Sequence, residues 1–209
     1  MKVNRRITTA ALAAIALGAL TTIVSCDAAQ AQDTVRVRGA IESIDGSTYV
    51  IKARDGADLK VALADKAQIA AVVKASLTDI KQDLFVGVTA MPQSDGSLRA
   101  VEVHIFPEAV RGTGEGHYSW DLQPKSTMTN ANVDQVVTAV DGQTLTLKYK
   151  DGEKKILVAA DTPIVAYVHG DNNDLKPGAK VFIAAVKQPD GTLQGRAWRV
   201  GRDGVTPPM

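Results

Sequence analysis

The segment SIDGSTYVIKARDGADLKVALAD, residues 43–65, returns in altered form as AVDGQTLTLKYKDGEKKILVAAD, residues 139–161. Both Asp-Gly pairs of the first segment recur in the second, each 96 residues further on and without a gap. Self-similarity at a fixed spacing is typical of a duplicated structural unit. The chain is therefore predicted to contain two copies of one domain.

The similarity continues beyond these segments. DIKQDLFVGVTA, residues 79–90, is similar to DLKPGAKVFIAA, residues 174–185. SDGSLRAVEV, residues 94–103, is similar to PDGTLQGRAW, residues 189–198. Both of these matches have an offset of 95, so one residue is missing in the second copy. Together the two copies account for most of the chain beyond its N-terminal segment.

Each copy has the pattern of short strands. Residues 48–52 and 144–148 are β-branched and apolar, and Asp-Gly pairs, a strong hairpin signal, flank them. Residues 59–63 alternate apolar and polar side chains, as a half-buried strand does. A short helical turn is expected at Ser76–Ile80, where Ser76 and Asp79 have the spacing of a capping box.

The strand pattern predicts an all-β protein made of two tandem small OB-like barrels, because closing a small sheet removes its exposed edges. We expect the first barrel at residues 34–106 and the second at 132–203. Residues 107–131 are expected to be a structured linker, and residues 204–209 a tail. The alternative is one sandwich of ten to twelve strands that is built from both copies.

Residues 1–31 are typical of a secretory signal peptide. A basic start is followed by the uncharged apolar run of residues 7–24 and by an Ala-Gln-Ala cleavage signal at 29–31. We therefore expect a periplasmic protein. The alternative is lipidation at Cys26, which follows a lipobox-like Ile-Val-Ser, and a membrane is an expected partner only in that case.

The charge balance argues against nucleic acid as a partner. The chain has 24 basic and 23 acidic residues and a formal charge of +1. Removal of residues 1–31 takes away three basic residues and one acidic residue, which leaves −1. A protein that binds nucleic acid needs a basic surface to attract the phosphate backbone.

The central stretch HIFPEAVRGTGEGHYSWDLQPKSTMTN, residues 104–130, lies between the copies and invites three interpretations. The first is a metal site, since imidazoles and carboxylates bind transition metals such as zinc, copper, nickel or manganese. The spacing of these groups is not diagnostic of any metal. The candidate ligands are His104, Glu108, Glu115, His117 and Asp121.

The second interpretation is an enzyme. His117, Ser119 and Asp121 lie within five residues, but the members of a catalytic triad normally converge from separate segments. The serine is also not in the nucleophile-elbow motif of the α/β-hydrolases. We therefore expect no catalytic residues, and an uncharacterised hydrolase is the alternative.

The third interpretation is an interface formed by Tyr118, Trp120 and Arg111. Tryptophan has a large apolar ring with one hydrogen-bond donor, which suits a joint between domains or a binding surface. The expected function is that of an exported non-enzymatic binding or scaffolding protein without a cofactor. Its expected partner is an unidentified periplasmic protein or small ligand. The alternative is a metal-binding accessory protein that uses a transition metal at the linker.

The order of strands and Asp-Gly turns, with the loop Leu175–Gly178, resembles an exported bacterial domain-of-unknown-function family with tandem OB-like β domains. The first copy departs from the pattern, since Asp83 stands where the loop glycine would be. Residues 104–131 and the DGVTPPM segment at 203–209 are similar to proteobacterial members that are often labelled "metal ABC transporter permease". That label is at odds with the lack of spanning helices in the sequence. The resemblance implies the fold and provides no functional residues.

Overall fold

The computed structural model describes residues 34–209. The expected signal peptide and the lipidation site at Cys26 lie outside these residues. The described chain forms 12 strands and two single-turn 3-10 helices, and the expected all-β fold is confirmed. The strands are β1 (Thr34–Asp45), β2 (Thr48–Ala53), β3 (Asp58–Lys74), β4 (Phe85–Pro92), β5 (Leu98–Ile105), β6 (Gly116–Ser119), β7 (Thr127–Ala139), β8 (Gly142–Tyr149), β9 (Gly152–Ala159), β10 (Ile164–His169), β11 (Lys180–Lys187) and β12 (Leu193–Gly201).

The two helices are η1 (Leu77–Asp79) and η2 (Glu108–Val110). Within residues 34–209, no helix has the length and apolar character needed to cross a membrane. At η1, the Asp79 carboxylate accepts a hydrogen bond of 2.8 Å from the backbone N–H of Ser76, as the capping-box spacing predicts. Asp174 accepts the equivalent bond of 3.1 Å from the N–H of Asp171 in the second copy.

The strands hydrogen-bond in the order β12-β11-β1-β2-β3-β10-β5-β4-β7-β8-β9, and β6 pairs with β7. Two further pairings, β12 with β3 and β5 with β9, close this sheet into two rings. Barrel 1 consists of β1, β2, β3, β11 and β12. Barrel 2 consists of β4, β5, β7, β8 and β9, and β10 joins β3 to β5. Each barrel therefore has five strands, the number found in OB-like barrels.

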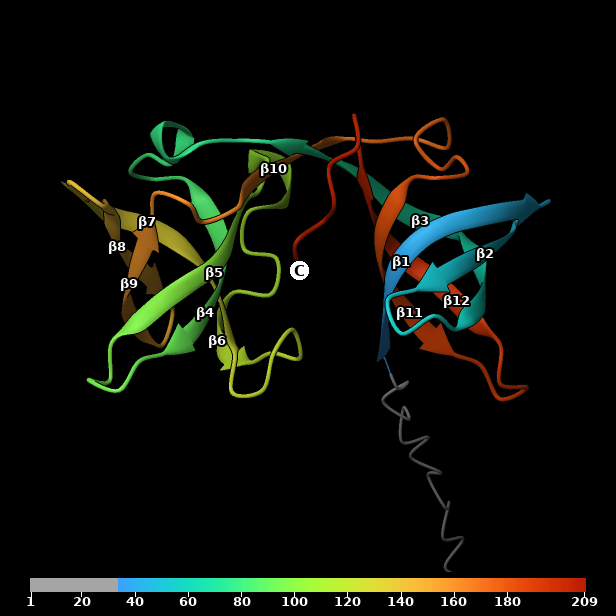
Figure 1. Ribbon diagram of the computed structural model, residues 1–209, viewed down its shortest axis with the longest axis horizontal. Coiled ribbons are helices and arrows are strands. Elements are labelled where there is room, and N and C mark those ends of the chain that lie inside the picture. Colours follow the sequence, from blue (N-terminus) through green and yellow to red (C-terminus); the bar gives the residue numbers. More distant parts are fainter. Residues whose placement is uncertain (1–33) are drawn as a thin grey trace, which may run out of the picture. The chain divides into compact units, whose positions relative to one another are not determined.

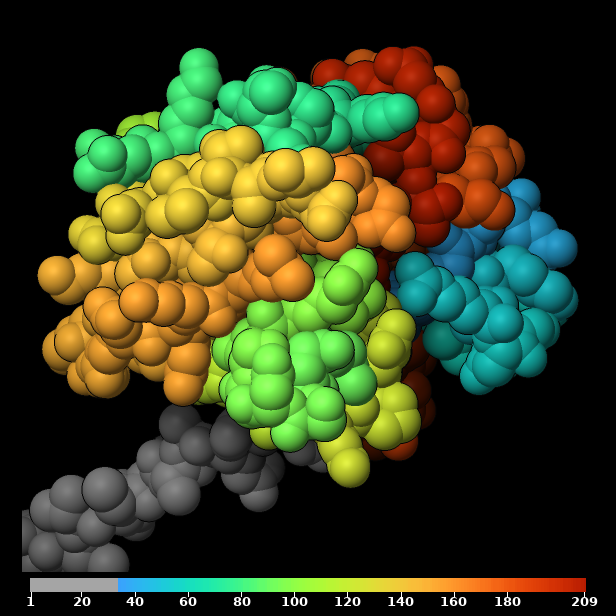
Figure 2. All heavy atoms as spheres, turned by 60° about the vertical axis from the view of Figure 1, so that its left-hand side comes forward, coloured from blue at the N-terminus to red at the C-terminus, as the bar shows by residue number. Residues whose placement is uncertain are grey.

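Each barrel takes strands from both copies. In Figure 1 the blue and teal strands β1, β2 and β3 lie beside the red strands β11 and β12, and the green strands β4 and β5 lie beside the yellow and orange strands β7 to β9. Figure 2 shows the same mixing on the surface of barrel 2, where green residues flank yellow and orange ones. The two copies have exchanged their last two barrel strands.

The expected limits of 34–106 and 132–203 therefore mark the repeated sequence units and not the barrels. The physical reason is the length of β3, whose 17 residues extend over about 56 Å, far more than the six-residue partner β2 can pair with. The C-terminal half of β3 leaves barrel 1 and leads the chain into β4 of barrel 2. In the second copy Pro163 interrupts the same run, which becomes the separate strands β9 and β10.

The exchange has a local two-fold axis. β10 pairs antiparallel with the end of β3, and Val72 lies directly opposite Tyr167 in this ladder. These two residues occupy the same position in the two copies, 95 residues apart. Pairing between equivalent residues is the arrangement of a two-fold symmetric interface, here formed within one chain.

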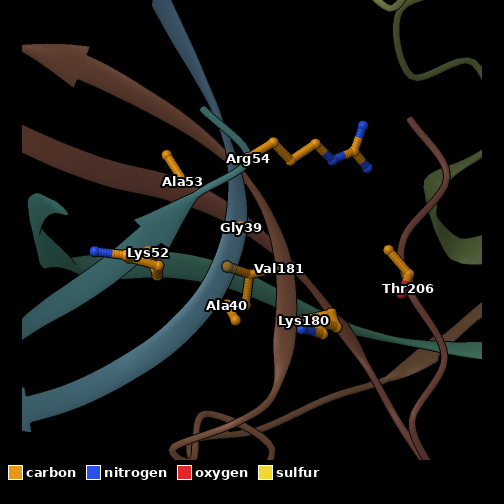
Figure 3. A pocket seen from close by; sticks show the side chains of 8 residues that line it. All are labelled: Gly39, Ala40, Lys52, Ala53, Arg54, Lys180, Val181 and Thr206. Atoms are coloured by element: carbon orange, nitrogen blue, oxygen red, sulfur yellow. The ribbon is translucent and has the colours of Figure 1, made fainter. Parts of the chain in front are cut away.

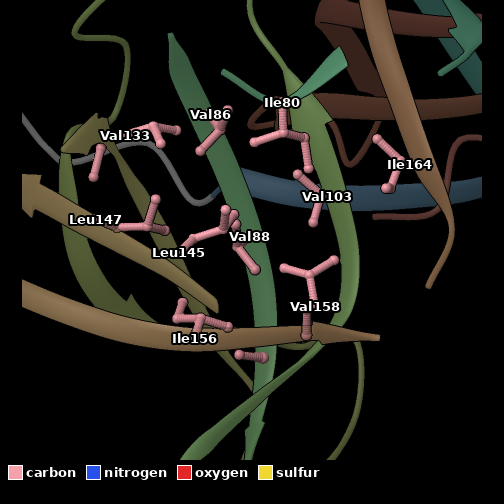
Figure 4. Close-up of a cluster of buried hydrophobic side chains, with 13 residues drawn as sticks. Ile80, Val86, Val88, Val103, Val133, Leu145, Leu147, Ile156, Val158 and Ile164 are labelled. Carbon is pink, nitrogen blue, oxygen red and sulfur yellow. The ribbon is translucent and has the colours of Figure 1, made fainter. Parts of the chain in front are cut away.

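Each barrel has its own apolar core. In barrel 2 branched aliphatic side chains from all five strands meet at the centre, as Figure 4 shows for Val86, Val103, Leu145 and Ile156. In barrel 1 the largest core side chain is Trp198, which is fully buried 5.0 Å from the ring of Tyr49. A third apolar cluster lies between the barrels around Phe106, Tyr167, Phe182 and Met209.

Candidate functional site

A cavity of about 180 Å³ lies at the third apolar cluster, and we call it the seam cavity. Side chains from both barrels, from the central stretch and from the C-terminal segment line it. The C-terminal end of the chain lies between the two sets of barrel strands in Figure 1. The aromatic and sulfur-containing side chains of the cavity wall include Phe106, Tyr118, Trp120, Met128, Tyr167, Phe182 and Met209.

On the side of barrel 2, a row of residues on three neighbouring strands forms the cavity wall. Asn130 of β7 lies opposite Gly87 of β4, which lies opposite His104 of β5. A Cβ on Gly87 would lie 1.9 Å from His104 Nε2 and 2.6 Å from Asn130 Oδ1. The imidazole and the amide can face one another across this strand only because residue 87 has no side chain.

Barrel 1 presents the equivalent row with other chemistry. Phe182 and Arg199 take the positions of Gly87 and His104, and they pair across β11 and β12 in the same way. The Arg38 guanidinium lies 5.2 Å from the ring centre of Phe182. The two barrels therefore offer different side chains to one shared space.

The size of the cavity has a simple origin in the sequence. Thr89 and Glu102 are buried neighbours on the outer face of barrel 2. The equivalent residues of the second copy are Ala184 and Ala197, and both line the cavity. Two alanines in place of a threonine and a glutamate leave the space that the cavity occupies.

A buried polar chain supports His104. Its Nδ1 lies 3.1 Å from Glu102 Oε2, and the hydroxyl of Thr89 donates a hydrogen bond to the other carboxylate oxygen. Glu102 is 1% exposed and His104 2% exposed, so both groups depend on these partners for their polar contacts. The carboxylate fixes the orientation of the imidazole ring.

Tyr167 packs against the residues at the equivalent positions 104 and 199. Its ring stacks on His104 with 5.0 Å between ring centres, and the Arg199 guanidinium lies 5.1 Å from its centre. Burial, followed by the negative charge of Glu102, raises the pKa of Tyr167 well above 10. The phenol keeps its proton and donates to Met209 Sδ at 2.6 Å.

Two buried polar atoms of residues that line the cavity have no partner in the protein. They are the indole donor Trp120 Nε1 and the amide acceptor Asn130 Oδ1. Within residues 34–209 there is one more such side-chain atom, Gln143 Oε1, on β8 and not in the lining. Buried polar groups are nearly always hydrogen-bonded, so two exceptions at one cavity mark it as the candidate site.

Three arginines lie around the cavity, as do the carboxylates of Asp121 and Glu102. Arg36 lies 4.1 Å above the Trp120 ring, and Arg38 binds both carboxylate oxygens of Asp121 at 2.7 and 3.3 Å. Burial raises the pKa of Asp121, but the hydrogen bond from Arg38 and the charges of both arginines outweigh it and lower that pKa overall. Arg199 has no carboxylate partner among the salt bridges of the described chain.

The five side chains predicted as metal ligands have different partners in the structure. Among residues 34–209, no three His, Cys, Asp or Glu side chains form a group that could hold a metal ion. The metal-binding alternative stays a prediction. The partners are Glu102 for His104, Arg111 for Glu108, the backbone N–H of Lys150 for Glu115, Thr129 for His117 and Arg38 for Asp121.

His117 and Asp121 likewise do not form the hydrogen bonds of a triad with Ser119. His117 Nδ1 lies 2.8 Å from the hydroxyl of Thr129, and Asp121 binds Arg38. Burial, and then the positive charge of Lys154, lower the pKa of His117.

The predicted interface residues have two different environments. The Trp120 ring lies 6.4 Å from Phe182 of barrel 1, and Tyr118 lies 6.1 Å from Trp120. Arg111 stays within barrel 2, where it binds Glu108 and donates to the backbone oxygen of Asp83 at 2.8 Å. The expected linker contains η2 and β6, and β6 extends barrel 2 by pairing with β7.

Sequence reasoning missed Glu102, Asn130, Tyr167, Phe182 and Arg199 as site residues. They come from five strands that the exchange brings together, and no local motif connects them. A signal was nevertheless present. Aligned at an offset of 95, the copies place His104 against Arg199 and Gly87 against Phe182, so that chemically different residues occupy equivalent positions in a repeated framework.

Another hollow, of about 350 Å³, lies on barrel 1 and is lined in part by Lys52, Arg54 and Thr206. Figure 3 shows the Arg54 side chain extended toward the C-terminal segment, where it donates to the oxygen of Pro207 at 3.4 Å. Lys52 is paired with Asp58 at 2.8 Å. None of the unpartnered buried atoms found in residues 34–209 belongs to this lining, so the seam cavity is the stronger candidate.

Comparison with known protein families finds a match for this chain. Residues 38–104 and 136–196 match the family described as Domain of unknown function (DUF5666). The chain belongs to this family. Its two matched segments correspond to the two copies, and each segment contributes strands to both barrels. No curated protein and no solved structure matches the chain significantly.

Proposed function

We propose that this DUF5666 protein is an exported, periplasmic, non-enzymatic binding module that holds a small, largely aromatic ligand in the seam cavity. The observation that carries the proposal is the pair of buried, unpartnered polar atoms, Trp120 Nε1 and Asn130 Oδ1, in the lining of one aromatic cavity. A ligand that accepts from the indole and donates to the amide would satisfy both atoms.

The volume supports a ligand of about one ring. A dry protein cavity of about 150 Å³ binds benzene, so a cavity of about 180 Å³ has room for a ring with one or two small substituents. Rings stack well on aromatic walls such as Trp120 and Phe182. Few convergent polar groups in a mostly apolar cavity are typical of small-molecule sites.

Export is supported by the sequence of residues 1–31, which has the three parts of a signal peptide. Lipidation of Cys26 would instead tether the same binding module to a membrane. The two forms differ in mass and in membrane association, so mass spectrometry of the protein from its host distinguishes them.

The indole signals of an NMR spectrum test the binding proposal. The protein has two tryptophans, and Trp198 Nε1 donates to the oxygen of Gly195 inside barrel 1, which makes it an internal reference. On titration with phenol, benzamide and 4-hydroxybenzamide, we expect a saturable shift of the Trp120 indole signal and none of the Trp198 signal.

Two variants complete this test. Asn130→Ala should weaken the binding of 4-hydroxybenzamide, because the donor of the ligand loses its acceptor. Gln143→Ala, which removes the unpartnered amide outside the cavity, should leave binding unchanged. The proposal is wrong if neither these compounds nor a charged aromatic compound of the same size shifts the Trp120 signal, or if both indole signals move together without saturation.

A further inference from the structure

We propose that the seam cavity selects an anionic single-ring compound, an aromatic carboxylate with a ring hydroxyl, whose carboxylate binds Arg199. This inference rests on the proposed function and names its ligand class. It starts from the position of Arg199, a cation that lines the cavity and stacks on Tyr167.

Arg199 has free hydrogen-bonding capacity. Its guanidinium carries five N–H donors. One donates to the backbone oxygen of Trp198 at 3.2 Å and another reaches the hydroxyl of Tyr167, and the others remain for a ligand. Stacking on Tyr167 holds the plane of the guanidinium and leaves its edge for a ligand. A fixed guanidinium edge suits two parallel bonds to a carboxylate, which a lysine could not provide.

The neighbouring charges favour an anion as well. Arg36 and Arg38 both contact the Asp121 carboxylate, and Arg38 also donates to the oxygen of Met209, so two guanidinium groups lie on this side of the cavity. The other acidic group nearby, Glu102, lies beneath His104 and is bonded to it and to Thr89. Neither carboxylate pairs with Arg199.

The two unpartnered polar atoms of the lining indicate which second substituent the ring of the ligand carries. Trp120 Nε1 donates and Asn130 Oδ1 accepts, and a single hydroxyl group can satisfy both, since it has one hydrogen and two lone pairs. A ring with a hydroxyl and a carboxylate therefore satisfies both unpartnered buried atoms of the lining and binds Arg199 as well. 4-Hydroxybenzoate is the simplest probe of this kind.

Calorimetric titration of the mature full chain with two matched probes tests the inference. 4-Hydroxybenzoate carries the charge, and 4-hydroxybenzamide has nearly the same shape without it. We expect the anion to bind at least about tenfold more tightly than the amide, as a charge-assisted hydrogen bond implies.

Variants assign the preference to one arginine. Arg199→Gln should weaken the binding of 4-hydroxybenzoate about tenfold or more and leave the binding of 4-hydroxybenzamide nearly unchanged. Arg199→Lys should recover only part of the lost affinity. The control Arg99→Gln removes the same charge from an exposed site on β5 outside the cavity. An unchanged Trp198 indole signal shows that each variant is folded.

The outcomes separate the two proposals. If both probes bind equally, or if Arg199→Gln behaves like Arg99→Gln, the inference is wrong while the binding function stands. If neither of these probes nor phenol or benzamide shifts the Trp120 signal, the binding function fails, and the inference fails with it.

Discussion

His104 and Arg199 stand 95 residues apart at equivalent positions of the two copies, and both pack against the ring of Tyr167. Tyr167 itself lies at the local two-fold axis, opposite Val72. The repeated framework thus brings two equivalent positions together, and different side chains at those positions make the cavity between them asymmetric. Duplication with exchange provides a way to build one site from two copies of one domain.

Gly87→Ala should disrupt the barrel 2 wall of the cavity. The new Cβ would lie 1.9 Å from His104 Nε2, so the imidazole must move away from its position above Gly87. We expect a loss of about 1–3 kcal/mol in the free energy of unfolding, the usual cost of overpacking, measured by urea denaturation.

The variant Gly87→Ala/His104→Ala is the control for this effect. Removal of the ring makes room for the added methyl group, so the double variant should be more stable than the sum of the two single effects predicts. Simple additivity of the two free-energy changes would contradict a clash between these residues.

A single copy should form a dimer. Residues 34–106 contain β1 to β3 of barrel 1 and β4 and β5 of barrel 2, and each set lacks the strands that close its barrel. Two such chains can complete one another's sheets and remove the open edges. Light scattering should give twice the mass of the fragment, whereas the chain of both copies should be a monomer under the same conditions. A folded monomer of residues 34–106 would contradict the exchange.

Much of this fold was predictable from local sequence. The Asp-Gly pairs and the alternation of apolar residues indicate where strands begin and end, and the offset of 95 to 96 indicates two similar units. The exchange was not predictable in the same way, because alternation tells which face of a strand is buried and not which copy pairs with it. The one local sign of the exchange is Pro163. It interrupts the strand in the second copy, whereas the equivalent strand of the first copy, β3, continues.

The site was less predictable than the fold. The central stretch contains Trp120 and His104, which line the cavity, whereas the carboxylates of Glu108 and Asp121, which the sequence offers as metal ligands, have arginine partners in the structure. Exposed loop carboxylates pair readily with nearby cations, and sequence spacing does not reveal such partners. The residues that complete the cavity, such as Arg199, lie almost a hundred positions away.

Arg38→Lys should loosen the C-terminal segment. The Arg38 guanidinium binds the backbone oxygen of Met209 at 2.7 Å and both oxygens of Asp121, and a lysine cannot make all these bonds at once. We expect faster hydrogen exchange in residues 203–209, measured by mass spectrometry, because local opening then requires less free energy. Arg111→Lys, which changes an arginine that binds within barrel 2, should leave exchange in this segment unchanged. Equal exchange rates in both variants would contradict the role of Arg38.

The protein should become less stable as the pH decreases, because the pKa of His117 is lowered in the folded state. Burial and the charge of Lys154 lower its pKa below the ordinary value of 6.5, so below that pH the unfolded chain binds a proton that the folded chain resists. The unfolded state then gains stability, and the free energy of unfolding decreases from about pH 6.5 downward until the pH falls below the folded pKa.

Urea denaturation at about pH 7.5 and about pH 5.5 measures this effect. The difference in unfolding free energy between the two pH values should be smaller in His117→Gln than in the unmodified protein. His104 and His169 are present in both proteins, so their contributions cancel in the comparison. Lys154→Gln should shrink the same difference by a smaller amount, because Lys154 is the lesser cause of the shift. A pH dependence that is identical in all three proteins would mean that His117 titrates alike in the folded and unfolded chain, and its partial burial beside Thr129 would then carry no electrostatic cost.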